Sequence, residues 1–193
     1  MAKQLIDRIK DSLAKEGVKA GSSASRTWLR TKIGELKPSP SKLMKDANRL
    51  KDSSMIGKMY FYFYDPKTKD SFPYYDRFPL VIPIERYSDG FLGLNLHYIS
   101  PKQRVILLDK LSHYLNNHSY DDSTRINLSY EHLKNASTIY EGIPCIKKYL
   151  YKQVKSRFLE ITADEWDIAA LIPYEYFDGA TKNKVWTDSR KKF

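Results

Sequence analysis

The chain has 193 residues, with 33 Lys and Arg against 23 Asp and Glu, so its formal charge is +10 at neutral pH. That length suits one domain, and 41% hydrophobic and 13% aromatic residues exclude a wholly disordered chain. No apolar run approaches the roughly 18 residues of a membrane-spanning helix, no apolar secretory segment follows Met1, and the single Cys145 excludes an internal disulfide and a cysteine-based zinc site. We therefore expect a protein of a reducing compartment that contacts no membrane.

The positive charge is concentrated in the N-terminal part of the chain. Residues 1–58 contain 14 Lys and Arg and 6 Asp and Glu, a balance of +8, whereas residues 59–193 contain 19 and 17. Aromatic residues show the opposite distribution, since Trp28 is the only one before residue 59. This asymmetry predicts a basic arm over residues 1–57 and a compact body over residues 58–193. A basic arm is typical of contact with a polyanion or an acidic protein surface, and a solvated tail is the alternative.

Three short amphipathic helices are predicted within the arm, over residues 2–16, 26–36 and 41–50, with prolines at 38 and 40 separating the last two. Helices this short are marginal alone, so we expect them to be ordered only against another surface. Their apolar residues, together with a loop in the body that mixes tyrosines with an arginine, form the predicted partner interface: Leu5, Ile9, Trp28, Leu43, Leu50, Tyr74, Tyr75 and Arg77.

The body begins with five consecutive aromatic residues at 60–64, which suit a strand with bulky side chains on both faces. Further strands are expected over 78–86, where two prolines require an edge or bulged path, and over 91–98 after a turn at 88–90. Helices are expected over 101–117, 124–140 and 144–154, then a strand over 157–161 and a helix that a capping box of Thr162 and Glu165 starts. The predicted fold class is α+β: a small antiparallel β-meander over about residues 58–98 packed against three to four helices, behind an extended basic N-terminal arm.

Catalytic chemistry is not indicated by any motif in the sequence. There is no glycine-rich phosphate loop, and the four histidines lack the spacing of metal ligands. A metal-dependent nuclease needs converging carboxylates, but Asp65 and Asp70 are better explained as turn formers and the pair Asp121 and Asp122 as a helix start. We predict no enzymatic activity, no cofactor and no metal site.

Two basic clusters are candidates for contact with DNA phosphates. The first lies in the arm and the second in the C-terminal tail, where Trp186 could anchor it; a solvated tail is the alternative for the second. Most aromatic residues are expected in the core rather than in base stacking. The predicted nucleic-acid-binding residues are Arg26, Arg30, Lys32, Lys45, Arg49, Lys182, Lys184, Arg190 and Lys191.

Several blocks of the body resemble a family of small virion proteins of T-even-like contractile-tailed bacteriophages, especially marine and cyanobacterial phages. The blocks are MYFYFYDPK at 59–67, PYYDRFPL at 73–80, GFLGLNLHY at 90–98, EWDIA at 165–169 and VWTDSR at 185–190. The resemblance covers roughly residues 58–192 and leaves the arm outside. Members are described as DNA end protectors, so the resemblance implies a virion protein, assembled in the host bacterial cytoplasm, that caps packaged DNA against exonuclease. It implies no catalytic residue.

Two functions remain open from the sequence. In the first, a non-enzymatic virion protein binds or caps packaged double-stranded DNA through phosphate contacts. In the second, the protein is a structural tail, neck or baseplate subunit whose arm clamps neighbouring subunits. The amphipathic segments favour the second, because DNA binding does not require them. Both imply other phage virion proteins as partners and several copies in a larger assembly.

Overall fold

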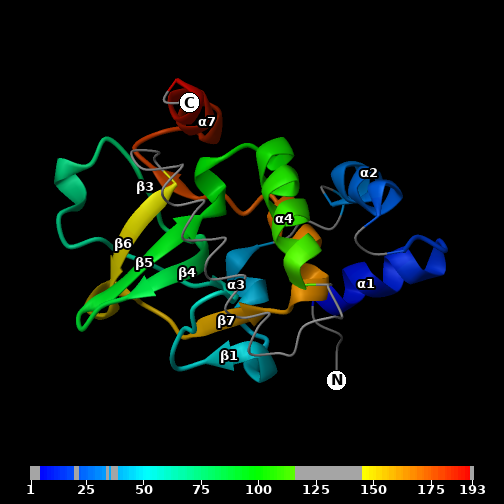
Figure 1. The fold of residues 1–193 in the computed structure, drawn as a ribbon, viewed down its shortest axis with the longest axis horizontal. Coiled ribbons are helices and arrows are strands. Elements are labelled where there is room, and N and C mark those ends of the chain that lie inside the picture. Colours follow the sequence, from blue (N-terminus) through cyan, green and yellow to red (C-terminus); the bar gives the residue numbers. More distant parts are fainter. Residues whose placement is uncertain (1–4, 20–21, 34, 36–38, 116–144, 192–193) are drawn as a thin grey trace.

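The computed structural model describes residues 5–19, 22–33, 35, 39–115 and 145–191. It has an α+β fold in which a six-stranded antiparallel sheet packs against helices (Figure 1). In the part described, no helix is long and apolar enough to cross a membrane. The predicted fold class is confirmed.

The sheet has the strand order β1-β7-β2-β4-β5-β6, so strands from both ends of the chain lie beside the central meander. Its strands are β1 (Leu50–Lys51), β2 (Met59–Phe61), β4 (Leu80–Arg86), β5 (Gly90–Asn95), β6 (Ile146–Leu150) and β7 (Phe158–Ile161). The predicted consecutive strands β2, β4 and β5 pair antiparallel, and the ladder between β4 and β5 has an irregularity between Pro83 and Glu85. A bulge accommodates the proline there, because proline cannot donate a ladder hydrogen bond.

Alternation along β2 explains the aromatic run at its end. Met59 and Phe61 are buried in the main core, whereas Tyr60 and Tyr62 join a second buried cluster with Val81, Phe91, Tyr149 and Phe158. Successive side chains of a strand point to opposite faces of the sheet, so the run supplies aromatic rings to both faces. The sheet is therefore buried on two sides, as the bulky residues on both faces predicted.

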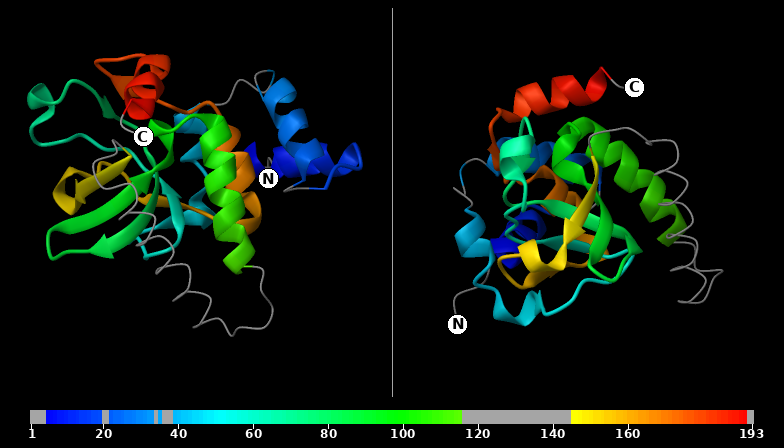
Figure 2. Two further views of the ribbon diagram at one scale, coloured as in Figure 1. Left: turned by 45° about the horizontal axis from the view of Figure 1, so that its top comes forward. Right: turned by 90° about the vertical axis from the view of Figure 1, so that its left-hand side faces the viewer.

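Helices cover one face of the sheet (Figures 1 and 2). They are α1 (Leu5–Lys15), α2 (Ser23–Lys32), α3 (Pro40–Leu43), α4 (Pro101–Leu115) and α6 (Trp166–Leu171). Ser22 is the N-cap of helix α2, and its side chain accepts a hydrogen bond from the Ser25 amide; the predicted capping box of Thr162 and Glu165 precedes α6.

A two-stranded ribbon of β3 (Tyr75–Asp76) and β8 (Phe177–Asp178) carries the chain to helix α7 (Lys182–Arg190). Gly179 follows β8 with φ of 84°, and a side-chain Cβ at this position would lie 2.6 Å from the Pro73 carbonyl oxygen. Both the left-handed backbone and the close approach require glycine here.

An extended N-terminal arm is not confirmed. Ile6, Ile9, Leu13, Leu29 and Leu43 are buried in the same core cluster as residues of the sheet and of α6. The segment folds back because its apolar faces complete the main core.

Two other expectations about the elements need correction. The predicted helix over 144–154 is wrong, because residues 146–150 form β6 and pair with β5 over five residues. The predicted helix over 41–50 is reduced to α3 and a 3-10 turn, Ala47–Arg49, before β1. The expected helix over 124–140 lies outside the described residues.

Candidate nucleic-acid interface

A basic segment begins on the edge strand β6 and crosses from there to β7. Residues 146–157, which we call the basic edge segment, comprise β6, the 3-10 turn Tyr151–Gln153 and the chain leading to β7. The segment contains no Asp or Glu and carries five cations, interleaved with two tyrosines: Lys147, Lys148, Lys152, Lys155 and Arg157. Because β6 is an edge strand, one side of it is unpaired within the described sheet. The cations suit a polyanion, and Tyr151 adds a half-buried ring, whereas Tyr149 is buried in the second core cluster.

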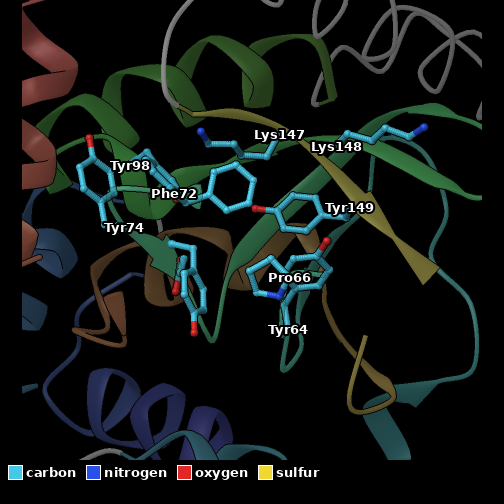
Figure 3. A pocket seen from close by; sticks show the side chains of 10 residues that line it. Tyr64, Pro66, Phe72, Tyr74, Tyr98, Lys147, Lys148 and Tyr149 are labelled. Carbon is cyan, nitrogen blue, oxygen red and sulfur yellow. The ribbon is translucent and has the colours of Figure 1, made fainter. Parts of the chain in front are cut away.

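A small pocket, which we call the tyrosine pocket, adjoins this segment (Figure 3). Its volume is about 70 Å³. Lys147 and Lys148 extend from β6 along one side of it, and aromatic rings surround the rest. The complete lining is Tyr64, Pro66, Phe72, Tyr74, Tyr75, Asp76, Tyr98, Lys147, Lys148 and Tyr149. Residues from four separate parts of the chain thus meet at one site.

A buried polar network lies behind the pocket and centres on Asp76. The Oδ2 atom of Asp76 lies 2.7 Å from His97 Nδ1 and accepts a hydrogen bond of 3.1 Å from Asn95 Nδ2, while Oδ1 accepts one of 3.1 Å from the Phe78 amide. Asn95 Nδ2 also lies 3.0 Å from the Tyr149 hydroxyl. The side chains of Asp76 and His97 are 1% and 0% exposed. The network therefore fixes one wall of the pocket.

The tyrosines at the pocket remain neutral at physiological pH. Burial raises the pKa of the Tyr149 phenol well above its ordinary value, and burial followed by the charge of Asp76 does the same at Tyr98. The ammonium of Lys147 lies 5.0 Å from the centre of the Tyr98 ring, and that of Lys148 lies 5.0 Å from the centre of the Tyr87 ring. Such cation–π contacts hold the lysine stems along the aromatic surface.

The C-terminal basic cluster is a docked helix. Trp186 Nε1 on α7 donates a hydrogen bond of 2.9 Å to the His97 carbonyl, and Ser189 Oγ donates one of 2.7 Å to the carbonyl of Tyr98. Since Tyr98 lines the tyrosine pocket, these bonds fix α7 beside it. Burial, and then the charge of Asp188 on α7, raise the pKa of the pocket residue Tyr74.

The family comparison covers nearly the whole chain. A family model described as phage T4 terminal DNA protecting protein matches residues 2–190. The chain belongs to this family. No match was found among curated proteins or among solved structures. Because the match to the terminal DNA protecting proteins begins at residue 2, the N-terminal segment is part of the family region, and the narrower extent taken from the resemblance is corrected.

Two of the predicted phosphate contacts in this terminal DNA protecting family member are occupied by its own carboxylates. Arg26 on α2 pairs with Asp109 and, at 3.2 Å, with Asp167. Arg49 pairs with Glu165, with Asp46 at 2.8 Å and with Asp7 at 3.0 Å. Both guanidinium groups therefore tie the N-terminal segment to the rest of the fold instead of facing solvent as free cations.

The remaining predicted cations do not form one surface. Lys32 pairs with Glu35 at 3.4 Å, whereas Arg30 and Lys45 are exposed and have no ion pair among the described residues. Helices α2 and α7 carry separate clusters, and α2 and β6 lie on opposite sides of α4 (Figures 1 and 2). On α7, Lys184 pairs with Asp188 at 2.8 Å, and the Lys182 ammonium lies 5.6 Å from the centre of the Trp186 ring. Arg190 and Lys191 end the same helix.

The predicted partner interface divides into two groups. Ile9 and Leu43 are buried in the core, and Leu5, Trp28 and Leu50 are half-buried against it, so these residues contact their own chain. Tyr74 and Tyr75 line the tyrosine pocket, and the Arg77 guanidinium lies 5.0 Å from the centre of the Tyr176 ring.

The sequence pattern does not single out the basic edge segment, because it predicts a helix over residues 144–154. The signal in the sequence is the run of five cations and two tyrosines without an acid. Within the described residues, no group of three His, Cys, Asp or Glu side chains could hold a metal ion.

Proposed function

We propose that this protein binds the ends of linear phage DNA without cleaving it and thereby shields them from exonucleases. The observation that carries the proposal is the acid-free basic edge segment in a member of the terminal DNA protecting family. Its lysines meet phosphates, with α7 as a second contact beside the tyrosine pocket, while Arg157 pairs with Asp52. We further expect the protein to act in the virion, in several copies and together with other virion proteins.

A non-catalytic role is supported by the state of the Asp76–His97 pair. A catalytic acid or base must reach the proton that it transfers. Here both side chains are sealed from solvent, and the carboxylate already accepts hydrogen bonds from Asn95 and from the Phe78 amide. The pair supports the pocket wall, because His97 Nδ1 and the carboxylate of Asp76 are partners of each other in the buried network.

The alternative of a tail, neck or baseplate subunit loses the observation that favoured it. The amphipathic segments do not need a neighbouring subunit, because Ile9 and Leu43 are covered by this chain's own core. We therefore do not propose clamping of neighbours by the N-terminal segment.

The test compares two triple variants with equal loss of charge. The first removes cations from the basic edge segment, and the second removes predicted N-terminal contacts: Lys147→Gln, Lys148→Gln and Lys152→Gln against Arg30→Gln, Lys32→Gln and Lys45→Gln. Affinity for linear and for closed circular duplex DNA is measured across salt concentrations. Each lost phosphate contact lowers the slope of log affinity against log salt by about 0.9.

We expect the wild type to prefer linear DNA and to slow its degradation by an exonuclease. The edge variant should have a shallower salt slope and weaker protection, and the N-terminal variant should behave like the wild type. A wild type without preference for ends contradicts the capping function. If only the N-terminal variant loses affinity for DNA, the phosphate contacts lie on the N-terminal segment and not on the basic edge segment.

A further inference from the structure

We propose that the tyrosine pocket holds one edge of the base of an unpaired nucleotide at the terminus of a DNA strand, while the adjoining phosphates lie on the basic edge segment. This inference rests on the proposed function and deepens it, because it specifies the form of DNA end that the protein distinguishes.

The pocket has the size and chemistry for part of one flat ring. Its volume of about 70 Å³ is roughly that of two water molecules in the liquid, at about 30 Å³ each, and far below the 300–1,000 Å³ or so of typical small-molecule sites. A whole nucleotide does not fit, and neither does a base pair. A single ring can enter edge first between aromatic side chains, which stack on any base.

An exposed aromatic residue marks the mouth of the pocket. The Phe72 side chain lines the pocket yet is 48% exposed, so a large apolar surface faces solvent there. Next to it, Tyr75 is held in place because its hydroxyl donates a hydrogen bond of 3.0 Å to Asp178 Oδ2. A base that stacks on Phe72 would cover this surface without displacing any residue of the core.

The charges around the pocket orient a nucleotide in one direction. Carboxylates lie on the side of the β3–β8 ribbon and the buried network, at Asp178 and Asp76, although Arg77 also lies 3.9 Å from Asp178. Cations lie on the side of β6, at Lys147 and Lys148, although Lys148 also pairs with Asp89 at 3.0 Å. A phosphate is repelled from the first side and attracted to the second. The neutral base therefore enters the pocket, and the phosphates remain on β6.

A second hollow extends this path. It has a volume of about 580 Å³ and is lined in part by Arg86, Tyr87, Ser88, Tyr151 and Ser156. Lys148 connects the two cavities, because it lines the tyrosine pocket and its ammonium lies 5.0 Å from the centre of the Tyr87 ring. The next nucleotides of the same strand thus have aromatic contacts at Tyr87 and Tyr151 and one cationic contact at Arg86, although Asp52 also lines this hollow.

An unpaired end is favoured because a paired base must first leave its partner. Extrusion of a base from a duplex costs unpairing and unstacking free energy, which an overhang has already lost. Stacking on one aromatic side chain changes affinity by about tenfold, corresponding to about 1.4 kcal/mol. We expect a short overhang to bind about tenfold more tightly than a blunt end.

The test uses the full-length protein and DNA hairpins with one open end. The end is blunt or carries one to three unpaired thymidines on the 3′ or the 5′ strand, and a closed dumbbell without ends is the reference. A fluorescent base analogue, 2-aminopurine, replaces the terminal unpaired base in a parallel set, because stacking quenches its emission. The variants are Phe72→Ala and, as a matched control, Tyr176→Ala, an aromatic residue that is 47% exposed but does not line the pocket.

We expect overhang binding and quenching in the wild type and in Tyr176→Ala, and loss of both in Phe72→Ala to the level of the blunt end. Equal binding of blunt and overhanging ends by the wild type would overturn the assignment of the pocket, as would an equal loss in both variants. Failure of the proposed function is a separate outcome, in which hairpins with open ends bind no better than the dumbbell. Both variants should keep the wild-type thermal midpoint, since both side chains are exposed.

Discussion

Replacing Arg49 by alanine tests whether the N-terminal segment is a structural part of the fold or a free DNA-binding arm. Arg49 donates a hydrogen bond of 2.9 Å to Glu165 Oε1 and one of 2.8 Å to Asp46 Oδ2. The side chains of Glu165 and Asp46 are 2% and 7% exposed, so removal of the guanidinium leaves two carboxylates out of contact with water. The variant should therefore lose stability.

The size of that loss follows from burial. Removing one partner of a buried ion pair costs about 3–5 kcal/mol. Lys10 lies 3.4 Å from Glu165 and still compensates part of its negative charge when the guanidinium is removed. We therefore expect a loss of about 3 kcal/mol in the free energy of unfolding, the lower end of that range. For a chain of this length, that corresponds to a thermal midpoint about 6–12 °C lower.

Arg157→Ala is the matched control, because Arg157 pairs with Asp52 at 2.7 Å on the surface. The two side chains are 49% and 87% exposed, and such pairs contribute about 0–1 kcal/mol. Urea denaturation at pH 7 measures the free energy of unfolding of both variants. DNA titration across salt then measures the slope. Equal stability of the two variants, with a slope reduced by about 0.9 only in Arg49→Ala, would refute the structural role and restore Arg49 as a phosphate contact.

Three further changes probe the fold at separate points. Gly90→Ala should cost about 1–3 kcal/mol in urea denaturation, because its Cβ would lie 2.0 Å from the Tyr149 carbonyl oxygen on β6; wild-type stability would contradict that packing. Arg104→Lys should cost about 3–5 kcal/mol, because lysine cannot reproduce the bonds of this buried guanidinium to four carbonyls and its pair with Glu175; a loss below about 1 kcal/mol would show that the site repacks. Burial raises the pKa of Glu165, but the hydrogen bonds and charges of its partners have the larger effect and hold this pKa below its usual value. Stability should therefore fall as the pH drops from about 5 through the lowered pKa. Glu165→Gln should flatten this part of the profile, and an unchanged acid limb measured by thermal unfolding would count against it.

Local patterns predicted the elements whose partners are near in sequence. The turn at 88–90 joins adjacent strands, and the capping box of Thr162 and Glu165 is complete within four residues. The prediction of a helix over residues 144–154 is wrong because the spacing of Ile146, Leu150 and Val154 is ambiguous. These residues fit one face of a helix and also one face of an interrupted strand. Residues 146–150 form a strand because they pair with β5, some fifty residues earlier. A local sequence pattern carries no information about such a distant partner.

Of the candidate site, the sequence predicts only the two residue types, tyrosines and cations. Tyr74 and Tyr75 were recognised as unusual, but their position opposite Lys147 depends on β6 and on the β3–β8 ribbon. For Arg26, the sequence shows the positive charge but not the carboxylate that pairs with it. That partner, Asp167, lies 141 residues away.

The interleaving of both chain ends in one core has a consequence for biosynthesis. Residue Leu50 of β1 pairs with Leu159 of β7, and the core that contains Ile6 also contains Val185. Contacts of such large sequence separation form slowly, since closure of long loops precedes any gain from packing. Almost the whole chain must therefore leave the ribosome before helix α1 can pack into the core. We expect folding to be post-translational and slow, and the N-terminal helices to be exposed to proteases and chaperones throughout synthesis.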